Sequence, residues 1–422
     1  MKLYQHQQKI IDDNPDKIGL FLGTGTGKTL TAIRLAEKKG LDTIVICPKS
    51  LQENWQNELD KFSSSDIKFL IISKENFKKD LKELPGYETL IWDEAHYASG
   101  LKSQIHKSTI SYIRRWNVKN IYLLTATPYM ANCWSVFALG KLLGRDWKWY
   151  KWNKTFFHQF RLGKKPPKGV KDRRRMIWKQ KDGIEKSIAN IVNKIGVTAR
   201  LEDLFDVPDQ IFLHEFFTLT KEQEKAMESV IETHPIVEFT KYHQICGGSL
   251  KGDGYIPDQF YRSEKLSRTL DLVKENKKIA IICRYNNELK MIYDLLHKNW
   301  SYNNNTKCPS NIFVINGKTK DKDSIIFNAE RAEESVILIN AACSEGYNLP
   351  SFPIMVFYSL DFSLKNYIQM LGRIQRANHL KKNVYIHMTT SNTIDENIYQ
   401  CIMNKQDFHI EIYAKTKQTK GL

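Results

Sequence analysis

The residues with the clearest chemistry form the stretch GTGTGKT, Gly23 to Thr29. It follows an apolar run that predicts a strand and precedes a run from Leu30 to Lys38 that predicts a helix. Strand, glycine-rich loop and helix are the setting of a phosphate-binding loop, in which backbone N–H groups and the helix N-terminus hold phosphate oxygens. The stretch departs from the strict pattern GxxxxGK[ST], because Leu22 stands where the first glycine is usual.

Two residues of this stretch have separate expected roles. Lys28 is expected to reach the terminal phosphates, and the hydroxyl of Thr29 to contact Mg2+. A glycine-rich turn that binds nothing is the alternative. The predicted nucleotide-binding residues of the loop are Gly23, Thr24, Gly25, Thr26, Gly27, Lys28 and Thr29.

A carboxylate pair, Asp93 and Glu94, follows the apolar run Leu90 to Trp92. Asp93 is expected to hold Mg2+ through water, since Mg2+ keeps much of its hydration. Glu94 is expected to orient and deprotonate the water that attacks the terminal phosphate. The alternative is a solvated acidic loop, which the strand before it and the GKT loop upstream disfavour.

Near the other end of the chain, the segment QMLGRIQR places Gln369, Arg373 and Arg376 close together. A guanidinium stabilises the charge that develops on a transferred phosphoryl group. The two arginines are three positions apart and share one face if the segment is helical. These three residues join Lys28 and Glu94 as the predicted catalytic set, and a surface helix with solvated arginines is the alternative.

Short β-rich runs alternate with helical runs in both halves of the chain, and this pattern predicts two doubly wound α/β domains with parallel sheets. In such folds ligands bind at the carboxyl ends of the strands. We expect a first domain at residues 1–208 and a second at 209–422. The expected strands are residues 18–22, 43–47, 69–72, 90–92 and 121–124, then 211–217, 279–282, 312–315, 336–339, 354–357 and 384–386.

Two stretches interrupt the alternation. Residues 144–186 mix tryptophan and phenylalanine with lysine and arginine, which suits either a nucleic-acid surface or a solvated charge run beside a small aromatic cluster. Residues 219–262 begin with a helical pattern at 221–233 and include a glycine-rich loop at 247–252. Both stretches are expected to be insertions.

Composition narrows the class of partner. The net charge is +17 with a sequence pI of about 9.3, which favours a polyanion and nucleic acid first. The seven cysteines are scattered, which argues against a structural zinc site and suits a reducing compartment. No apolar run is long enough to span a bilayer and the N-terminus has no signal-peptide core, so we expect a cytoplasmic or nuclear protein rather than a secreted or membrane one.

Together these motifs resemble those of superfamily-two helicases, and within them the Swi/Snf-type branch of DNA translocases. Beyond GTGTGKT, QMLGRIQR and the tetrapeptide DEAH, which is Asp93 to His96, the resemblance covers nearly the whole chain. Its further motifs are Leu3-Tyr4 with His6-Gln7, Cys47 to Leu51 with Asn54-Trp55, Lys102-Ser103, Leu124 to Pro128, Ile282 to Tyr285, Ile315 to Thr319 and Cys343 to Leu349. The last of these lacks a glycine that the branch usually has, where Cys343 or Ser344 stands.

The resemblance implies two RecA-like lobes that use ATP and Mg2+, with Gln7 contacting the adenine. It implies that His96, Thr125 and Thr127 couple hydrolysis to nucleic-acid contact. It also implies a grip on the phosphates of nucleic acid, which gives little sequence preference. The positions implied for this grip are Pro48, Lys49, Ser50, Ser73, Lys74, Arg284, Asn316, Gly317, Cys343 and Ser344.

The resulting hypothesis is an ATP-dependent DNA translocase or helicase acting on duplex or branched DNA, of viral or bacterial origin and active in replication, repair or recombination. We expect it to act as a monomer on DNA, with a protein partner as an option. An RNA-directed helicase is one alternative. A nucleotide-gated nucleic-acid binder that hydrolyses little is another, and the intact Glu94, Gln369, Arg373 and Arg376 argue against it.

Overall fold

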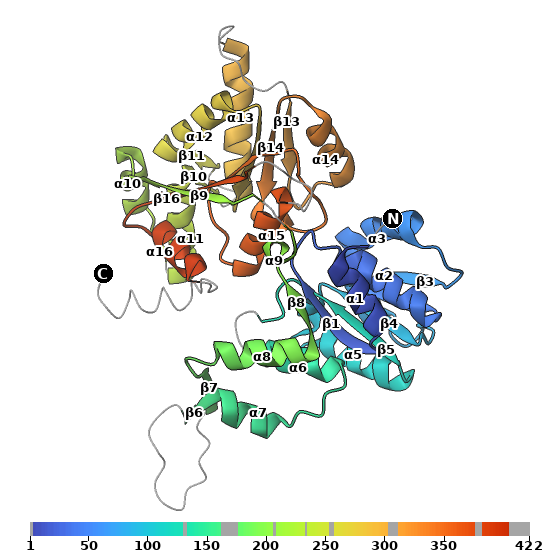
Figure 1. Cartoon of the computed structure of the whole chain (residues 1–422). Helices are drawn as coiled ribbons and strands as arrows, with labels where there is room; N and C mark the ends of the chain where they lie inside the picture. Colours follow the sequence, from blue (N-terminus) through green and yellow to red (C-terminus); the bar gives the residue numbers. More distant parts are fainter. Residues whose placement is uncertain are drawn as a thin grey trace, which may run out of the picture. The chain divides into compact units, whose positions relative to one another are not determined.

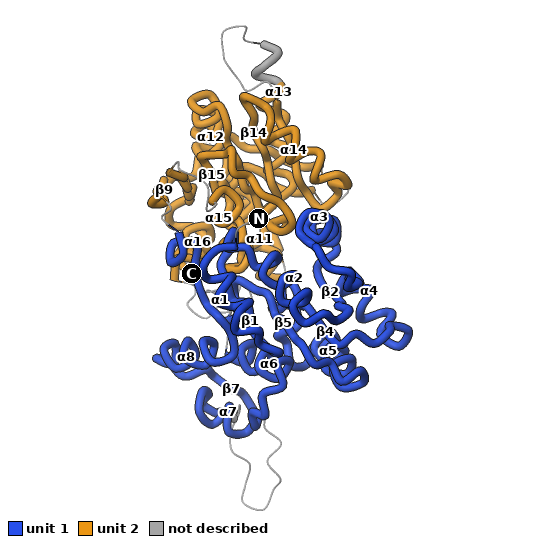
Figure 2. Tube along the Cα trace, turned by 45° about the vertical axis from the view of Figure 1, so that its right-hand side comes forward, with its two compact units in different colours: residues 1–205 blue, residues 206–422 orange. Residues whose placement is uncertain are grey.

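The computed structural model divides the chain into two compact units, residues 1–205 and 206–422, coloured separately in Figure 2. Among the described residues, no helix is both long and apolar enough to cross a membrane. The structure describes residues 3–129, 133–161, 176–205, 208–232, 234–252, 257–302, 311–375 and 382–404.

The first unit is built on a parallel six-stranded sheet (Figure 1). Its strands are β1 (Lys17–Leu22), β2 (Thr43–Cys47), β3 (Phe69–Ser73), β4 (Thr89–Asp93), β5 (Asn120–Leu124) and β8 (Gly196–Ala199). They lie in the order β3-β2-β4-β5-β1-β8. All the strands expected in this half are present, whereas β8 at the sheet edge was not predicted.

Successive residues of each strand point to opposite faces of this sheet, as the pleat requires. On one face Val45 and Cys47 pack with the helices α1, α2 and α3, and on the other Ile44 and Ile46 pack with α5, α6, α7 and α8. Their bounds are α1 (Gln5–Asp13), α2 (Lys28–Lys39), α3 (Gln52–Phe62), α5 (Gln104–Arg115), α6 (Trp134–Leu142), α7 (Trp149–Phe156) and α8 (Glu185–Ile195). The shorter elements are α4 (Lys74–Lys79), α9 (Leu201–Leu204), η1 (Lys49–Leu51) and η2 (Ala95–Ala98).

The stretch at 144–186 contains α7 and an antiparallel pair of strands outside the main sheet. This pair is β6 (Phe157–Arg161) and β7 (Met176–Gln180), with Phe157 opposite Gln180. Its basic residues Lys164, Lys165, Lys168, Lys171 and Arg173 to Arg175 lie outside the described residues.

The second unit has its own parallel six-stranded sheet, in the order β13-β14-β12-β15-β16-β9. The strands are β9 (Ile211–Phe217), β12 (Lys278–Cys283), β13 (Ile312–Ile315), β14 (Ser335–Asn340), β15 (Ile354–Phe357) and β16 (Val384–Thr390). The predicted α/β class with two doubly wound parallel sheets is therefore confirmed. All of the strands expected here are present.

Two helical layers enclose this second sheet. Residues such as Ala280 and Ile282 pack on the side of α14, α15 and α16, and Ile279 and Ile281 pack on the side of α12 and α13. The elements are α10 (Lys221–Glu228), α11 (Pro235–Cys246), α12 (Glu264–Glu275), α13 (Asn286–Tyr302), α14 (Lys322–Arg331), α15 (Leu364–Ile374), α16 (Ile394–Met403), η3 (Ala341–Cys343), β10 (Ser249–Leu250) and β11 (Gln259–Phe260).

Two local expectations in this unit were wrong. The helix expected at 221–233 ends at Glu228, because the β-branched Val230 and Ile231 follow and Pro235 begins the next helix. The glycine-rich stretch at 247–252 is not only a loop, because β10 within it pairs with β11.

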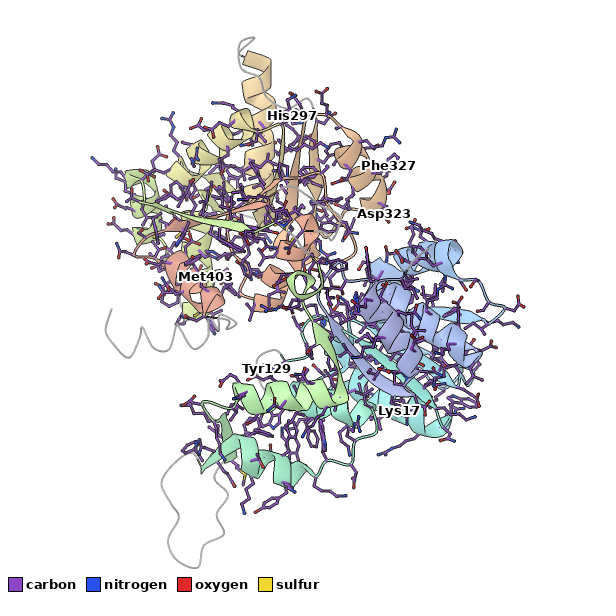
Figure 3. All side chains as sticks on the ribbon, viewed as in Figure 1. Lys17, Tyr129, His297, Asp323, Phe327 and Met403 are labelled. Atoms are coloured by element: carbon purple, nitrogen blue, oxygen red, sulfur yellow. The ribbon has the colours of Figure 1, made fainter. Side chains whose placement is uncertain are left out.

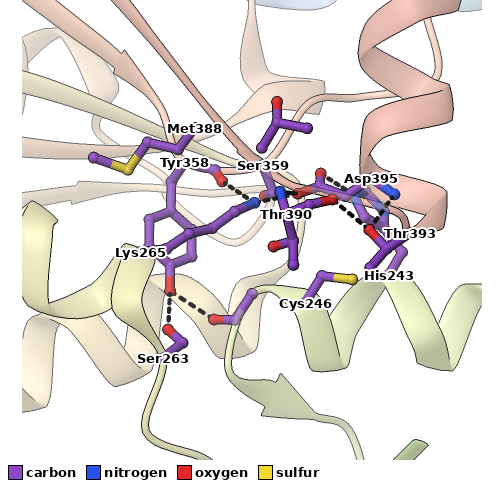
Figure 4. A network of polar contacts seen from close by, with 12 residues as sticks. His243, Cys246, Ser263, Lys265, Tyr358, Ser359, Met388, Thr390, Thr393 and Asp395 are labelled. Carbon is purple, nitrogen blue, oxygen red and sulfur yellow. Dashed lines mark hydrogen bonds and ion pairs between the residues drawn. The ribbon is translucent and has the colours of Figure 1, made fainter. Parts of the chain in front are cut away.

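A buried charge network joins three elements of the second unit (Figure 4). The Lys265 ammonium of α12 bonds to the Asp395 carboxylate of α16 and to the Tyr358 carbonyl, the latter at 3.2 Å. The backbone N–H of Thr390 in β16 donates to the same carboxylate at 2.8 Å. Burial alone would raise the pKa of Asp395, but Lys265 and His243 hold it below its usual range.

Candidate functional site

The loop after β1 is wrapped around the side chain of Lys28. The ammonium donates to the carbonyls of Leu22 and Gly23, each at 2.8 Å. Gly25 and Gly27 have φ of 75° and 81°, in the left-handed region that favours glycine. A Cβ on Gly27 would lie 2.4 Å from the amide nitrogen of Gln7, so the close approach of this side chain also requires glycine.

Further hydrogen bonds hold the loop in place. The Thr26 hydroxyl donates to the Gly23 carbonyl at 2.7 Å, and the Gly23 N–H donates to the carbonyl of Ala199 in β8 at 2.8 Å. Thr24 and Thr29 are half-buried. Within the part of the chain that the structure describes, the Thr29 hydroxyl makes no hydrogen bond, so its oxygen is available to a ligand.

Gln7 is tied to this loop from α1. Its amide nitrogen donates to the Gly27 carbonyl at 3.1 Å and to the Thr31 hydroxyl at 3.3 Å. Its amide oxygen accepts the Tyr4 N–H at 2.9 Å. The side chain is 1% exposed. Gln7 therefore helps to hold the loop at Gly23 to Thr29 in place through contacts from α1. A contact of Gln7 with adenine stays a prediction.

An aromatic group lies beside the same loop. The rings of Tyr4 and Phe205 are 4.6 Å apart between centroids, and His6 lies 6.1 Å from Phe205. A ring nitrogen of His6 is 3.0 Å from the Thr26 carbonyl, which joins the group to the loop. Tyr4 and His6 belong to a predicted motif, whereas Phe205 was not predicted, because no local pattern links residues so far apart in the chain.

Asp93 ends β4 with both carboxylate oxygens bonded. Oδ2 accepts the indole N–H of Trp55 at 2.8 Å, and Oδ1 accepts the Glu94 N–H at 2.9 Å. Burial and the neighbouring Glu94 raise the pKa of Asp93 to about 6, against the opposing effects of Trp55 and Lys28. Lys28 follows β1 and Asp93 ends β4, and both strands run parallel in one sheet, so both residues lie at its carboxyl edge.

Glu94 begins a line of polar contacts that crosses to the next strand. Its backbone is left-handed, with φ of 51°, and its Oε2 lies 3.0 Å from Nδ1 of His96. The same ring nitrogen is 3.3 Å from the Thr125 hydroxyl after β5, which accepts the Thr127 N–H at 3.1 Å. The structure thus brings together Glu94 and the three residues expected to couple hydrolysis to nucleic-acid contact.

The donor set at this edge fits a magnesium ion. Mg2+ prefers carboxylate and hydroxyl oxygens and retains water in its shell. The Thr29 hydroxyl and the Asp93 carboxylate are oxygen donors of this kind. A cation beside Asp93 would also favour the ionised carboxylate, because opposite charge lowers the pKa of an acid.

The predicted nucleic-acid contacts of the first unit follow β2 and β3. Lys49 and Ser50 in η1 are exposed, and Pro48 before them is buried. Ser73 is 2% exposed, and its hydroxyl caps α4 by accepting the Asn76 N–H. The Lys74 ammonium lies 3.9 Å from the centre of the Tyr97 ring. Lys49 and Ser50 are thus the most accessible of this set.

In the second unit, the predicted contacts lie after β12, where Arg284 stands, and after β13 and β14. Asn316 is held in a turn in which its side chain accepts the Lys318 N–H at 2.9 Å, and the space around Gly317 is open. Cys343 and Ser344 are buried. The Ser344 hydroxyl donates to Oε1 of Gln369 at 2.9 Å, so it orients this predicted catalytic residue.

Two arginines of the predicted sites, Arg284 and Arg373, are described in this unit and both are engaged within it. Arg284 is paired with Asp361 and stacks 3.9 Å from the centre of the Phe362 ring. Arg373 in α15 donates to the carbonyl of Tyr347 at 2.6 Å and is 8% exposed. In this structure both guanidinium groups are bound by residues of the same unit. The nucleic-acid contact of Arg284 and the catalytic role of Arg373 stay predictions.

Arg376 lies outside the described residues. A shared helical face of Arg373 and Arg376 was expected only if the segment is helical, and the described helix α15 ends at Ile374. Gln375 has extended backbone, with φ of −87° and ψ of 128°. Within the described residues, helical spacing in this segment is therefore shown up to Ile374.

Comparison with known proteins identifies related sequences. Residues 262–378 match the model of the helicase conserved C-terminal domain. The chain is 21% identical over 439 residues to the ISWI chromatin-remodeling complex ATPase ISW1 of Saccharomyces cerevisiae, covering 94% of this chain and 38% of that protein. It is 20% identical over 445 residues to the CHD3-type chromatin-remodeling factor CHR7 of Arabidopsis thaliana, covering 90% and 34%.

The chain thus spans little more than a third of the length of these curated relatives. Among solved structures, the Sulfolobus solfataricus SWI2/SNF2 ATPase core in complex with dsDNA aligns with 96% of this chain and 91% of that chain. The identity is 18% and the TM-score 0.41.

Proposed function

We propose that this chain, a Swi/Snf-type relative within helicase superfamily two, is a nucleic-acid-stimulated ATPase that translocates on DNA. One observation carries the proposal. The first unit gathers Lys28, Asp93 and Glu94 at the carboxyl edge of one parallel sheet, after β1 and β4, which are separated only by β5. This is the edge at which α/β folds bind their ligands.

In the proposed reaction, the loop N–H groups and Lys28 bind the phosphates of ATP. Lys28 exchanges its bonds to the Leu22 and Gly23 carbonyls for phosphate oxygens. Thr29 and Asp93 would hold Mg2+, which neutralises phosphate charge when bound. Glu94 orients the attacking water and takes its proton. His96 contacts both Glu94 and Thr125, so a change in the charge of Glu94 alters its contact with Thr125.

The second unit is proposed to contribute charge stabilisation. Arg373 would leave the Tyr347 carbonyl and stabilise the developing charge on the γ-phosphate, with Arg376 as its partner and Gln369 beside them. Supporting this, Gln369 is already oriented by Ser344.

DNA is the proposed polyanion because the chain carries a net charge of +17 and is related to chromatin-remodelling ATPases. Lys49, Ser50 and the open turn at Gly317 follow strand ends, where they would meet phosphates. Contacts of this kind position a strand without reading its bases.

The experiment is steady-state ATP turnover with duplex DNA, single-stranded DNA and RNA of matched length. Duplex DNA is expected to stimulate most, and Lys28→Ala to abolish turnover. Lys186→Ala, which removes an exposed lysine of α8, is the matched control and should behave like the wild type. Stimulation by RNA alone would move the substrate to the RNA-directed alternative, and ATP binding without turnover would favour a nucleotide-gated binder.

A further inference from the structure

A second feature of the first unit lies at the opposite edge of its sheet. A pocket of about 540 Å³ is bounded by α7, the residues 145–148 that precede it, and the end of α8. Lys194 and Ile195 line it and directly precede Gly196, the first residue of β8, whose amino end pairs with Gly19 of β1. The pocket therefore belongs to the amino edge of the strands, whereas the phosphate loop follows their carboxyl ends.

The neighbouring surface confirms this position. Lys17, labelled in Figure 3, begins β1, and its ammonium lies 3.6 Å from where a Cβ of Gly144 would stand. Lys17 and Arg145 line an adjoining hollow of about 620 Å³, and Arg145 also lines the pocket. Since β1 has six residues, its ends are roughly 17 Å apart at about 3.3 Å per residue. The pocket is thus remote from the nucleotide loop.

The rim of the pocket is strongly basic. Four cations, Arg145, Lys148, Lys151 and Lys194, face one carboxylate, Asp146, which is paired with Lys148 at 2.9 Å. Arg145, Lys151 and Lys194 are exposed and make no ion pair with another described residue. Unpaired cations before α7, on α7 and on α8 therefore surround the pocket and complement an anion that can reach both of its sides.

The floor of the pocket is aromatic and held rigidly. Trp147 and Trp152 are stacked with ring centroids 5.0 Å apart and an interplanar angle of 24°, and Phe156 lies 4.7 Å from Trp152. Trp147 lies directly against α6, where a Cβ on Gly140 would come within 2.1 Å of its ring. Gly140 therefore allows the indole to lie flat against the helix, half-buried, with part of its surface open to the pocket.

We propose that this pocket binds a single strand of nucleic acid, with a base on Trp147 and the flanking phosphates on Arg145, Lys151 and Lys194. An aromatic platform within a basic groove is the arrangement that binds single strands without sequence preference. A strand carries a phosphate on either side of each base, which matches cations on both sides of the floor. A paired base is stacked inside the duplex and does not reach such a floor.

The test uses the full chain and a single strand of about 10 nucleotides carrying 5-iododeoxyuridine, a length within the usual range for such sites. Irradiation and mass spectrometry locate the cross-links. The variant Lys151→Glu/Lys194→Glu is compared with Lys154→Glu/Lys186→Glu, which makes the same charge change on the same two helices at exposed positions that do not line the pocket. Circular dichroism checks that both variants are folded.

We expect a cross-link at Trp147 that falls at least about fivefold in the pocket variant and stays unchanged in the control, because phosphate contacts dominate such binding. The neutral variant Lys151→Gln/Lys194→Gln should make this cross-link less sensitive to salt. Duplex-stimulated ATP turnover should be unchanged in every variant, so the result is independent of the proposed ATPase function.

No cross-link in the pocket, or equal losses in both charge-reversal variants, would overturn the proposal. Stronger displacement by an acidic aromatic peptide than by unlabelled strand would instead make the pocket a peptide site.

Discussion

The indole N–H of Trp55 in α3 donates a 2.8 Å hydrogen bond to Oδ2 of Asp93 at the end of β4. Both side chains are buried, and the bond favours the ionised form of a carboxylate whose pKa burial raises to about 6. Trp55 therefore has a role beyond packing, because its hydrogen bond fixes the orientation of the Asp93 carboxylate, a proposed Mg2+ ligand, and favours its ionised form. Partners of this kind orient metal ligands and tune their affinity.

Replacing this tryptophan tests the relationship. Trp55→Phe keeps most of the packing, removes the N–H donor and should raise the Mg2+ concentration for half-maximal ATP turnover by about tenfold. Trp92→Phe is the matched control, since Trp92 is equally buried and donates to the Thr109 hydroxyl, away from Asp93. Equal magnesium requirements in the two variants would show that the bond to Asp93 has no functional role.

Gln7 should affect nucleotide binding through the loop. Gln7→Leu removes the bonds to the Gly27 carbonyl and the Thr31 hydroxyl, so we expect KM for ATP to rise about tenfold, equivalent to roughly 1.4 kcal/mol. The measurement is ATP turnover against ATP concentration. Gln8→Leu is the control, because among the described residues the Gln8 side chain bonds only to Asp12 on the surface of α1. An unaltered KM in Gln7→Leu would show that these bonds of Gln7 do not support nucleotide binding by the loop.

The buried pair Lys265 and Asp395 should stabilise the second unit cooperatively. Lys265→Met leaves the carboxylate without its cation and should cost about 3–5 kcal/mol in the free energy of unfolding, with a similar cost for Asp395→Leu. Because the double variant leaves no unpaired charge, it should lose clearly less than the sum of the two. Urea unfolding of the full chain gives these values. Additive losses would mean that the two residues do not act as a pair.

Acid sensitivity is expected from His387 in β16. Burial lowers the pKa of His387 to about 4, and its ring stacks on Phe357 with centroids 5.0 Å apart. The unfolded chain binds this proton near pH 6.5 and the folded chain only near pH 4, so its contribution is complete above pH 6.5 and is lost as the pH falls towards 4. At pH 5 the loss is about 2 kcal/mol.

The check is the free energy of unfolding measured between pH 7 and pH 4 for His387→Gln. Its decline should be shallower than in the wild type by about that amount at pH 5. His234→Gln changes an exposed histidine of the same unit and should follow the wild-type curve. A wild-type slope in His387→Gln would contradict the assignment.

Much of the fold could be predicted because its signal is local. The strands β2, β4 and β12 are short apolar runs buried on both faces, and each is flanked by a helical pattern. The nucleotide loop could be predicted for the same reason, since Gly23 to Thr29 are consecutive residues. By contrast, β8 is four residues long and begins with Gly196, so it carries neither the length nor the β-branched pattern of a buried strand.

The relationships that the sequence could not predict are contacts between distant residues. The bond of Trp55 to Asp93 and the contact of Phe205 with Tyr4 depend on how helices pack on the sheet. Lys265 and Asp395 are both charged, and nothing in their local patterns indicates that they are buried. The end of α15 before Arg376 likewise depends on the backbone at Gln375, which the QMLGRIQR motif does not reveal.

The central claim, DNA-stimulated ATP hydrolysis with Glu94 as the base, is tested most directly by ATP turnover of Glu94→Gln with saturating duplex DNA. The substitution keeps the size of the side chain but removes its ability to take a proton. The account predicts that nucleotide binding is retained while turnover falls at least about a hundredfold from the DNA-stimulated wild-type rate. Wild-type turnover in Glu94→Gln, or a wild-type rate that DNA does not change, would contradict it.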